Sequence, residues 1–258
     1  MGNIFKQTWV AAVIVTVLFF LTQFTLGRLL GVNHETMTSS TEEMKVGLMF
    51  RFSITATIFT VIALWARKAW NGGIYAQPGL PELPRWLWLI LILMVVQSVV
   101  KIAVNEWDQL GLDYVMILLV GVLLVGVAEE TTFRGINIRA IRGSTRNEFA
   151  VLLLSSLLFG LVHGVNILNG QDAVWTMGQI ANTFVGGAGF YIVLRLSGSL
   201  LIPILLHALW DFSVLGRVGE EASLLEGATL IGQVAVWGLT IVAAAIVFRQ
   251  SRRSSVQS

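Results

Sequence analysis

The sequence is dominated by apolar segments of about twenty residues that are separated by short polar connections. A helix of about twenty residues is roughly 30 Å long, which matches the hydrocarbon core of a bilayer. Eight such segments can be read, of which only the seventh is short: Trp9–Leu29, Lys45–Trp65, Trp86–Val104, Tyr114–Phe133, Phe149–Leu168, Trp175–Leu194, Leu200–Val214 and Thr229–Phe248. The sequence therefore predicts an all-α fold, a polytopic transmembrane bundle of about eight spans. Residues 1–258 are expected to form a single integral membrane domain.

The composition agrees with a chain that is solvated mainly by lipid. Charged residues make up 12% of the sequence, whereas soluble domains usually carry about 25%. The net charge is only +2, and the basic residues lie in short loops, so we expect membrane lipid as a partner and no nucleic acid. The chain has no cysteine, which excludes disulfides, thiolate metal ligands and a cysteine nucleophile.

Basic and acidic connections alternate along the chain. Arginines and lysines gather before the first span, in the second, fourth and sixth connections, and after the eighth span, while the other connections are mainly acidic. Basic connections usually remain in the cytoplasm. We therefore expect both termini to be cytoplasmic.

Five acidic or histidine residues lie within or at the end of apolar spans. Glu129 and Glu130 end the fourth span, His163 lies in the fifth, and His207 and Asp211 lie in the seventh. Each such residue costs roughly 2.5–3.5 kcal/mol on insertion scales, so those that are kept are candidates for function. The third histidine of the chain, His34, lies in a polar loop and is expected to be solvated.

Helical spacing sorts these residues, because side chains four positions apart share a face. Glu130 can pair with Arg134, which would leave Glu129 as the less compensated carboxylate and the candidate general base. Phe159 is placed one turn before His163 and can fix its ring by packing. His207 and Asp211 share a face in the same way, so Asp211 can orient His207 or join it as a metal ligand. In the sixth span, Gln179 and Asn182 serve either helix packing or a substrate groove.

Two imidazoles and two carboxylates on separate helices can bind or polarise water, and hydrolysis is the natural use of such a set. In one version His163, His207 and one or both of Glu129 and Asp211 hold a divalent metal, expected to be Zn²⁺. In the metal-free version Glu129 is the base, His163 positions the water and His207 stabilises the oxyanion. The carboxylate at Asp211 favours the version with metal, because a second buried anion is easier to keep charged beside a cation.

Three motifs follow one another within a core of about residues 119–215: Glu129-Glu130-x-x-x-Arg134, Phe159-x-x-x-His163 and His207-x-x-x-Asp211. In this order they resemble the motifs of the CPBP family, also called the Abi family. That family groups CAAX prenyl endopeptidases with bacteriocin-processing and immunity relatives. The resemblance implies an intramembrane metalloprotease that cleaves a peptide or membrane-associated protein, in the inner membrane of a bacterial cell. It also implies that Glu129 and His163 activate water, that Glu130 and Arg134 support the site, and that His207 and Asp211 complete it. The eukaryotic members usually have Asn at the position of Asp211.

A non-catalytic function is the alternative, because a transporter or a bacteriocin-immunity protein can use the same polar residues as an ion path or binding site. Depth is a second open question. Glu129, at the cytoplasmic end of its span, would lie roughly 20 Å from His163 if both helices were straight. We therefore expect either a fourth helix that sits deeper or a segment 135–147 that folds inward.

Overall fold

The computed structural model describes residues 7–70, 81–216 and 223–256, which form helices joined by turns. Their bounds are α1 Trp9–Leu29, α2 Thr41–Met44, η1 Lys45–Phe50, α3 Arg51–Ala69, η2 Arg85–Trp88, α4 Leu89–Val104, η3 Trp107–Gln109, α5 Leu112–Glu130, η4 Thr131–Asn137, α6 Ile138–Arg142, α7 Glu148–Val162, α8 Val165–Leu168, α9 Ala173–Ser197, α10 Leu201–Leu215 and α11 Ser223–Val256. Among the described residues, seven helices are long and apolar enough to cross a membrane, and α10 is a shorter apolar helix. The predicted polytopic helical bundle is confirmed, including the short seventh element.

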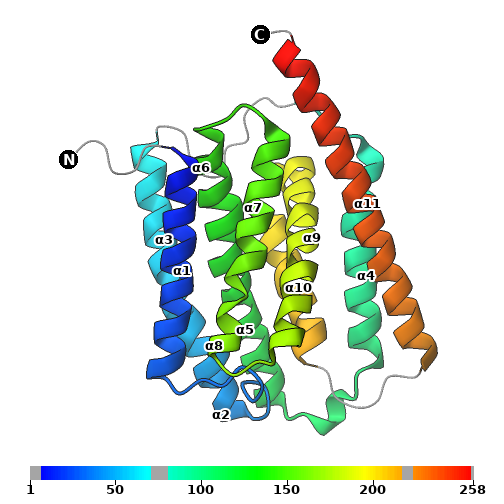
Figure 1. Ribbon diagram of the computed structural model, residues 1–258. Coiled ribbons are helices and arrows are strands. Elements are labelled where there is room, and N and C mark those ends of the chain that lie inside the picture. The colour runs from blue at the N-terminus through cyan, green and yellow to red at the C-terminus, as the bar shows by residue number, and fades with distance from the viewer. Residues whose placement is uncertain (1–6, 71–80, 217–222, 257–258) are drawn as a thin grey trace.

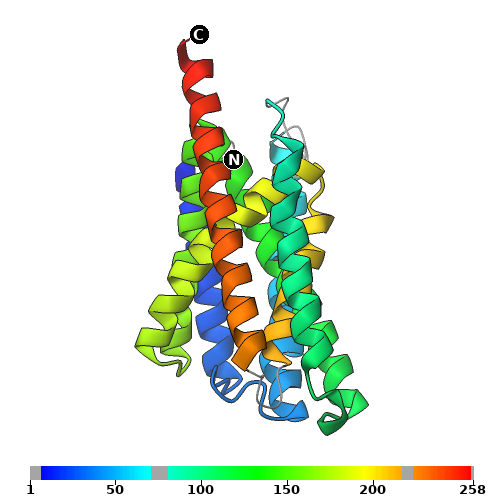
Figure 2. The ribbon, with the colours of Figure 1, turned by 90° about the vertical axis from the view of Figure 1, so that its right-hand side faces the viewer.

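The helices stand side by side in one bundle (Figure 1). α1 begins and α11 ends at the same end of the bundle, as an even number of crossings requires. Figure 2 shows α4 and α11 together on one outer side, and the two helices are in contact. Large apolar side chains such as Leu21, Val61, Val96 and Ile231 are exposed on the outer helices. Exposed apolar surface on every outer helix is suited to lipid rather than to water, and the chain is an integral membrane protein.

The fourth span is longer than its apolar pattern predicted. The expected end at Phe133 is wrong, because α5, η4 and α6 run on without a break from Leu112 to Arg142, over 31 residues. The residues of η4 are all buried, so its polar side chains face the bundle interior and not a membrane surface. η4 is a π-helix, a form that often marks functional sites. Glu129 therefore lies inside the span and not at its end.

This extension removes the expected difference in depth between the two motifs. Glu129 precedes Arg142 by 13 residues and His163 follows Glu148 by 15 residues, so each lies about 20 Å along its helix from the same end of the bundle. The deeper fourth helix is thus the correct alternative. The inward-folded segment is wrong, since residues 138–142 continue the helix.

A polar network joins three helices at this end. The Arg142 guanidinium donates two hydrogen bonds of 2.8 Å to the Glu148 carboxylate. Tyr191 on α9 donates its hydroxyl to the same carboxylate, and Arg195 lies 3.9 Å from it. A bidentate arginine–carboxylate pair is geometrically specific. It therefore fixes the start of α7 against the end of α6, and with it the matching depths of Glu129 and His163.

Candidate active site

Glu129 is the point at which the three motif helices meet. Its Oε2 lies 4.0 Å from Nε2 of His163 and 3.8 Å from Nε2 of His207. This oxygen is buried and has no hydrogen-bond partner among the described residues. A buried carboxylate oxygen without a partner is costly, so the position is suited to a bound water or substrate group. The sequence predicts that these three residues share one interior, and the structure brings them together.

Glu130 supports the site from the other side of the same helix. It is fully buried, with Oε1 3.0 Å from Arg134 Nη1 and 2.8 Å from His207 Nδ1. The predicted pair with Arg134 is present. Asp211 is expected from the sequence either to orient the His207 ring or to join it as a metal ligand. The carboxylate at Nδ1 of His207 is instead that of Glu130, and Asp211 lies 3.5 Å from Nε2. Glu130 therefore orients His207, and Asp211 faces the reactive side of the ring.

Aromatic rings enclose the Arg134–Glu130 pair. The guanidinium carbon of Arg134 lies 4.0 Å from the Phe159 ring centre and 5.0 Å from that of Phe190. Phe190 also stacks on His207, with 5.3 Å between ring centres. A Cβ on Gly187 would lie 3.2 Å from Phe159, so glycine lets α9 bring Phe190 close to the site. Sequence reasoning missed Phe190, because it belongs to no motif.

His163 is the C-cap residue of α7, and its ring is fixed by contacts with Phe159. Its Nδ1 lies 2.8 Å from the backbone oxygen of Phe159, an acceptor, so Nδ1 carries the proton. The Phe159 ring meets the imidazole edge-on at 5.1 Å, as the spacing predicted. In the neutral ring, Nε2 then has a lone pair. This lone pair lies on the side of Glu129, where it can accept a hydrogen bond from water or bind a metal.

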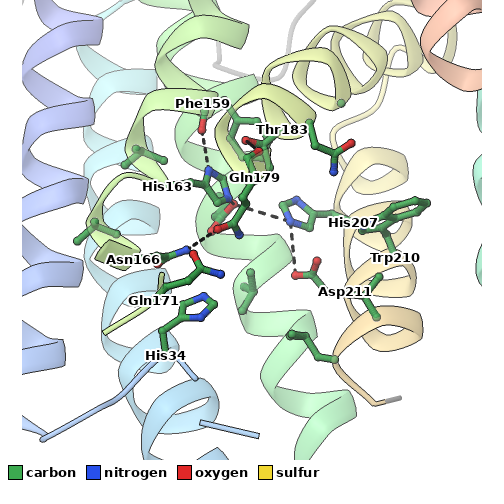
Figure 3. Close-up of a pocket in the computed structure, with 18 of the residues that line it drawn as sticks. His34, Phe159, His163, Asn166, Gln171, Gln179, Thr183, His207, Trp210 and Asp211 are labelled. Carbon is green, nitrogen blue, oxygen red and sulfur yellow. Dashed lines mark hydrogen bonds and ion pairs between the residues drawn. The ribbon is translucent and has the colours of Figure 1, made fainter. Parts of the chain in front are cut away.

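The site opens into a cavity of about 700 Å³, within the range of ligand pockets. Figure 3 shows His163, His207 and Asp211 in its wall, with Gln171 and His34 further along. His34 is half-buried and lines the cavity, so its expected solvation is wrong. Gln179 and Asn182 also line the cavity, which supports the groove alternative for them. Sequence reasoning missed Arg51, another lining residue.

The environment of His34 changes its titration. Burial lowers the pKa of His34 to about 4, and the charge of Arg51 acts in the same direction. His34 is therefore neutral at pH 7. It adds a polar group but no charge to the cavity wall.

The donor atoms permit a test of the expected metal. Tetrahedral ligands about 2.1 Å from Zn²⁺ lie about 3.4 Å apart, whereas two acceptors of one water, each about 2.8 Å from its oxygen, lie about 4.4 Å apart. The 4.0 Å between Glu129 and His163 is slightly nearer the second value, and the 3.8 Å between Glu129 and His207 is slightly nearer the first. Within residues 7–70, 81–216 and 223–256, no group of three or more His, Cys, Asp or Glu is spaced to hold a metal. The ring nitrogens have the right chemistry for a metal, but the Glu129–His163 separation is closer to that of two partners of one water.

The fold and the site define an integral membrane protein with a buried glutamate–histidine centre built from three helices. Residues 111–213 match the family model described as Type II CAAX prenyl endopeptidase Rce1-like. This part of the chain is similar to that family of endopeptidases, in agreement with the resemblance seen in the motifs. The match includes Glu129, His163, His207 and Asp211 and begins after the first three spans. No curated protein and no solved structure matches the chain.

Proposed function

We propose that the chain is an intramembrane endopeptidase that hydrolyses a peptide bond in a membrane-associated protein or peptide. The observation that carries this proposal is the approach of two imidazoles, on two different helices, to one buried oxygen of Glu129. The family match supports a peptidase. The name of the family further suggests a lipid-modified segment near a protein C-terminus as the substrate.

In the proposed reaction a water lies between Glu129 Oε2 and His163 Nε2 and donates one hydrogen bond to each. Its free lone pair attacks the carbonyl carbon of the scissile bond while Glu129 accepts its proton. The C–O bond forms and the carbonyl oxygen becomes an oxyanion. Glu129 then returns the proton to the departing amine as the C–N bond breaks.

His207 stabilises the oxyanion in this proposal. Glu130 accepts the hydrogen bond of its Nδ1, so donation to the oxyanion requires a second proton on Nε2, which is the form that an imidazolium provides. Asp211 lies 3.5 Å from Nε2. In the absence of substrate, its carboxylate accepts the hydrogen bond that the Nε2–H group donates. An ionised Asp211 cannot donate, so its proposed role is to hold His207 in the donor form.

Zinc remains the alternative proposal for water activation. Glu129, His163, His207 and Asp211 would hold it, and both imidazoles already present the arrangement of metal ligands, with Nδ1 bound to a carbonyl or carboxylate oxygen. A bound Zn²⁺ lowers the pKa of its water towards about 7. The separation of Glu129 and His163, 4.0 Å, favours the version without metal.

A proton path or ion-binding protein is the competing class. A relay places its ionisable groups in succession along a path, whereas hydrolysis needs them to converge. Here both histidines lie within 4.0 Å of the same carboxylate oxygen. Convergence supports the peptidase.

The experiment that tests the proposal uses purified wild type and Glu129→Ala in detergent with a library of internally quenched peptides. The library includes peptides with a farnesylated cysteine near the C-terminus. Glu43→Ala, at an exposed position in α2, is the control. We expect cleavage by wild type and by the control and none by Glu129→Ala. Equal cleavage by Glu129→Ala would overturn the proposal.

A further inference from the structure

Arg51 is a buried cation that the proposed reaction does not use. It is the first residue of α3 and 3% exposed. It lines the cavity that holds Glu129 and both catalytic histidines. It lies outside residues 111–213, so the family match assigns it nothing. Its position in the second span gives this part of the chain a direct link to the site.

Two of the three guanidinium nitrogens of Arg51, Nε and Nη1, are buried without a hydrogen-bond partner in the part of the chain that the structure describes. The ring of Phe52, 4.9 Å from the guanidinium carbon, supplies a cation–π contact. Arg134, the other buried arginine of the site, has Glu130 as its partner. A desolvated guanidinium with free N–H groups is costly to keep and is suited to binding a carboxylate in bidentate fashion.

The surroundings restrict what Arg51 can bind. Of the groups near it in the cavity, His34 is neutral at pH 7, because its pKa is lowered to about 4. Glu129 interacts with Arg51 electrostatically, yet Glu129 Oε2 also lacks a hydrogen-bond partner. The two groups therefore leave donors on Arg51 and an acceptor on Glu129 available in the same cavity.

We propose that Arg51 binds a carboxylate of the peptide substrate and thereby selects peptides that carry an anionic group close to the scissile bond. The inference rests on the proposed peptidase function. The carboxylate belongs either to the free C-terminus of the peptide or to an acidic side chain. A cavity of about 700 Å³ has room for only a few residues beside the site, so the anion must lie near the bond that is cleaved.

The test compares three quenched peptides with the same neutral sequence around the cleaved bond, using the full-length protein in detergent. The first ends in a free carboxylate, the second in an amide, and the third in an amide that follows a terminal glutamate. We expect wild type to prefer the first or the third over the second by about 100-fold in kcat/KM. Whichever anionic peptide is preferred identifies the source of the carboxylate. Equal cleavage of all three would overturn the inference while leaving the peptidase function intact.

Variants then assign the preference to Arg51. Arg51→Gln should reduce the preference in kcat/KM for the anionic peptide to about threefold or less, mainly by raising KM for that peptide. Arg51→Lys should keep part of the preference. Arg67→Gln removes a charge from an exposed position on the same helix and should keep all of it. If Arg51→Gln instead lowers cleavage of the three peptides by the same factor, Arg51 only balances the charge of Glu129 and the inference is wrong.

Binding measurements separate this inference from the proposed function. The cavity is lined by Trp175 and Trp210, so intrinsic fluorescence can report peptide binding without cleavage. If wild type cleaves no peptide, tighter binding of an anionic peptide by wild type than by Arg51→Gln would still support the carboxylate site. Equal binding of all peptides by both proteins would overturn it.

Discussion

Glu130 lies 2.8 Å from Nδ1 of His207, although the two residues are 77 positions apart in the chain. The same carboxylate oxygen lies 3.0 Å from Arg134. One fully buried carboxylate thus anchors a helix and sets the orientation of a ring on another helix. The spacing of Glu130 and Arg134 on one helix face is therefore only half of the arrangement. Changes in this pair are expected to affect both folding and the geometry of the reacting groups.

Arg134→Ala should destabilise the protein. It leaves the fully buried Glu130 with only His207 as a charge partner, and breaking a buried pair by removing one member costs roughly 3–5 kcal/mol. We expect a lower yield of monodisperse protein and an unfolding transition at lower temperature in detergent. Arg146→Ala, at an exposed position, should leave stability within about 0.5 kcal/mol. An Arg134→Ala protein that is as abundant and active as wild type would contradict a supporting role for the pair.

His207→Gln should lower catalysis more than binding. If His207 donates to the oxyanion, its interaction forms only in the transition state, and loss of one such donor costs about 10²–10³ in kcat. KM should change little. Ser213→Ala, on the same helix but bonded to a backbone oxygen, is the control. A fall in kcat of less than about threefold in His207→Gln would remove the ring from the oxyanion role.

The sequence predicts most of what depends on neighbours along one helix. The first span has the bounds expected from its apolar run, and the Glu130–Arg134 and Phe159–His163 contacts follow from a spacing of four residues. These predictions succeed because helical geometry alone decides which side chains share a face.

Contacts between helices were beyond such reasoning. The bond from Glu130 to His207 and the stacking of Phe190 on that ring depend on how α5, α9 and α10 pack, which no local spacing encodes. The end of the fourth span was misplaced for a related reason. Arg134 and Asn137 look like a polar helix end in the sequence, but both are buried against protein, and apolar pattern alone cannot separate a protein-facing polar residue from an interfacial one.

The orientation of the bundle gives a prediction for reporter fusions. α1 begins and α11 ends at one end, and the connection from α4 to α5 lies at the other (Figure 1). Because the basic connections fall at the first end, we expect it to face the cytoplasm. A fusion at the C-terminus should report a cytoplasmic location, and one inserted near residue 108 the opposite side. The same location for both fusions would contradict the topology.

His34 predicts a loss of stability in acid. Its pKa is lowered to about 4 in the folded protein, mainly by burial, while in the unfolded chain it is near 6.5. Between these values the unfolded state binds more protons, so the free energy of unfolding decreases as the pH falls from about 6.5 to 4. His34→Gln should make this decrease shallower when unfolding is followed at several pH values. Glu35→Gln, an exposed neighbour, should not. An unchanged slope in His34→Gln would show that His34 is equally protonated in both states.

Chelation distinguishes the two proposals for water activation. The separation of Glu129 Oε2 and His163 Nε2, 4.0 Å, is nearer to that of two acceptors sharing a water than to that of two zinc ligands. We therefore expect the purified protein to keep its cleavage activity after treatment with a chelator and to contain no stoichiometric metal. Metal content is measured on the same samples, and Zn²⁺, Co²⁺ or Mn²⁺ is added back. Loss of activity on chelation, with recovery on addition of metal, would instead establish the zinc version. Glu129→Gln then decides whether Glu129 is the general base or a metal ligand. If this variant still binds the metal but does not cleave the peptide, Glu129 acts as the base and not as a ligand.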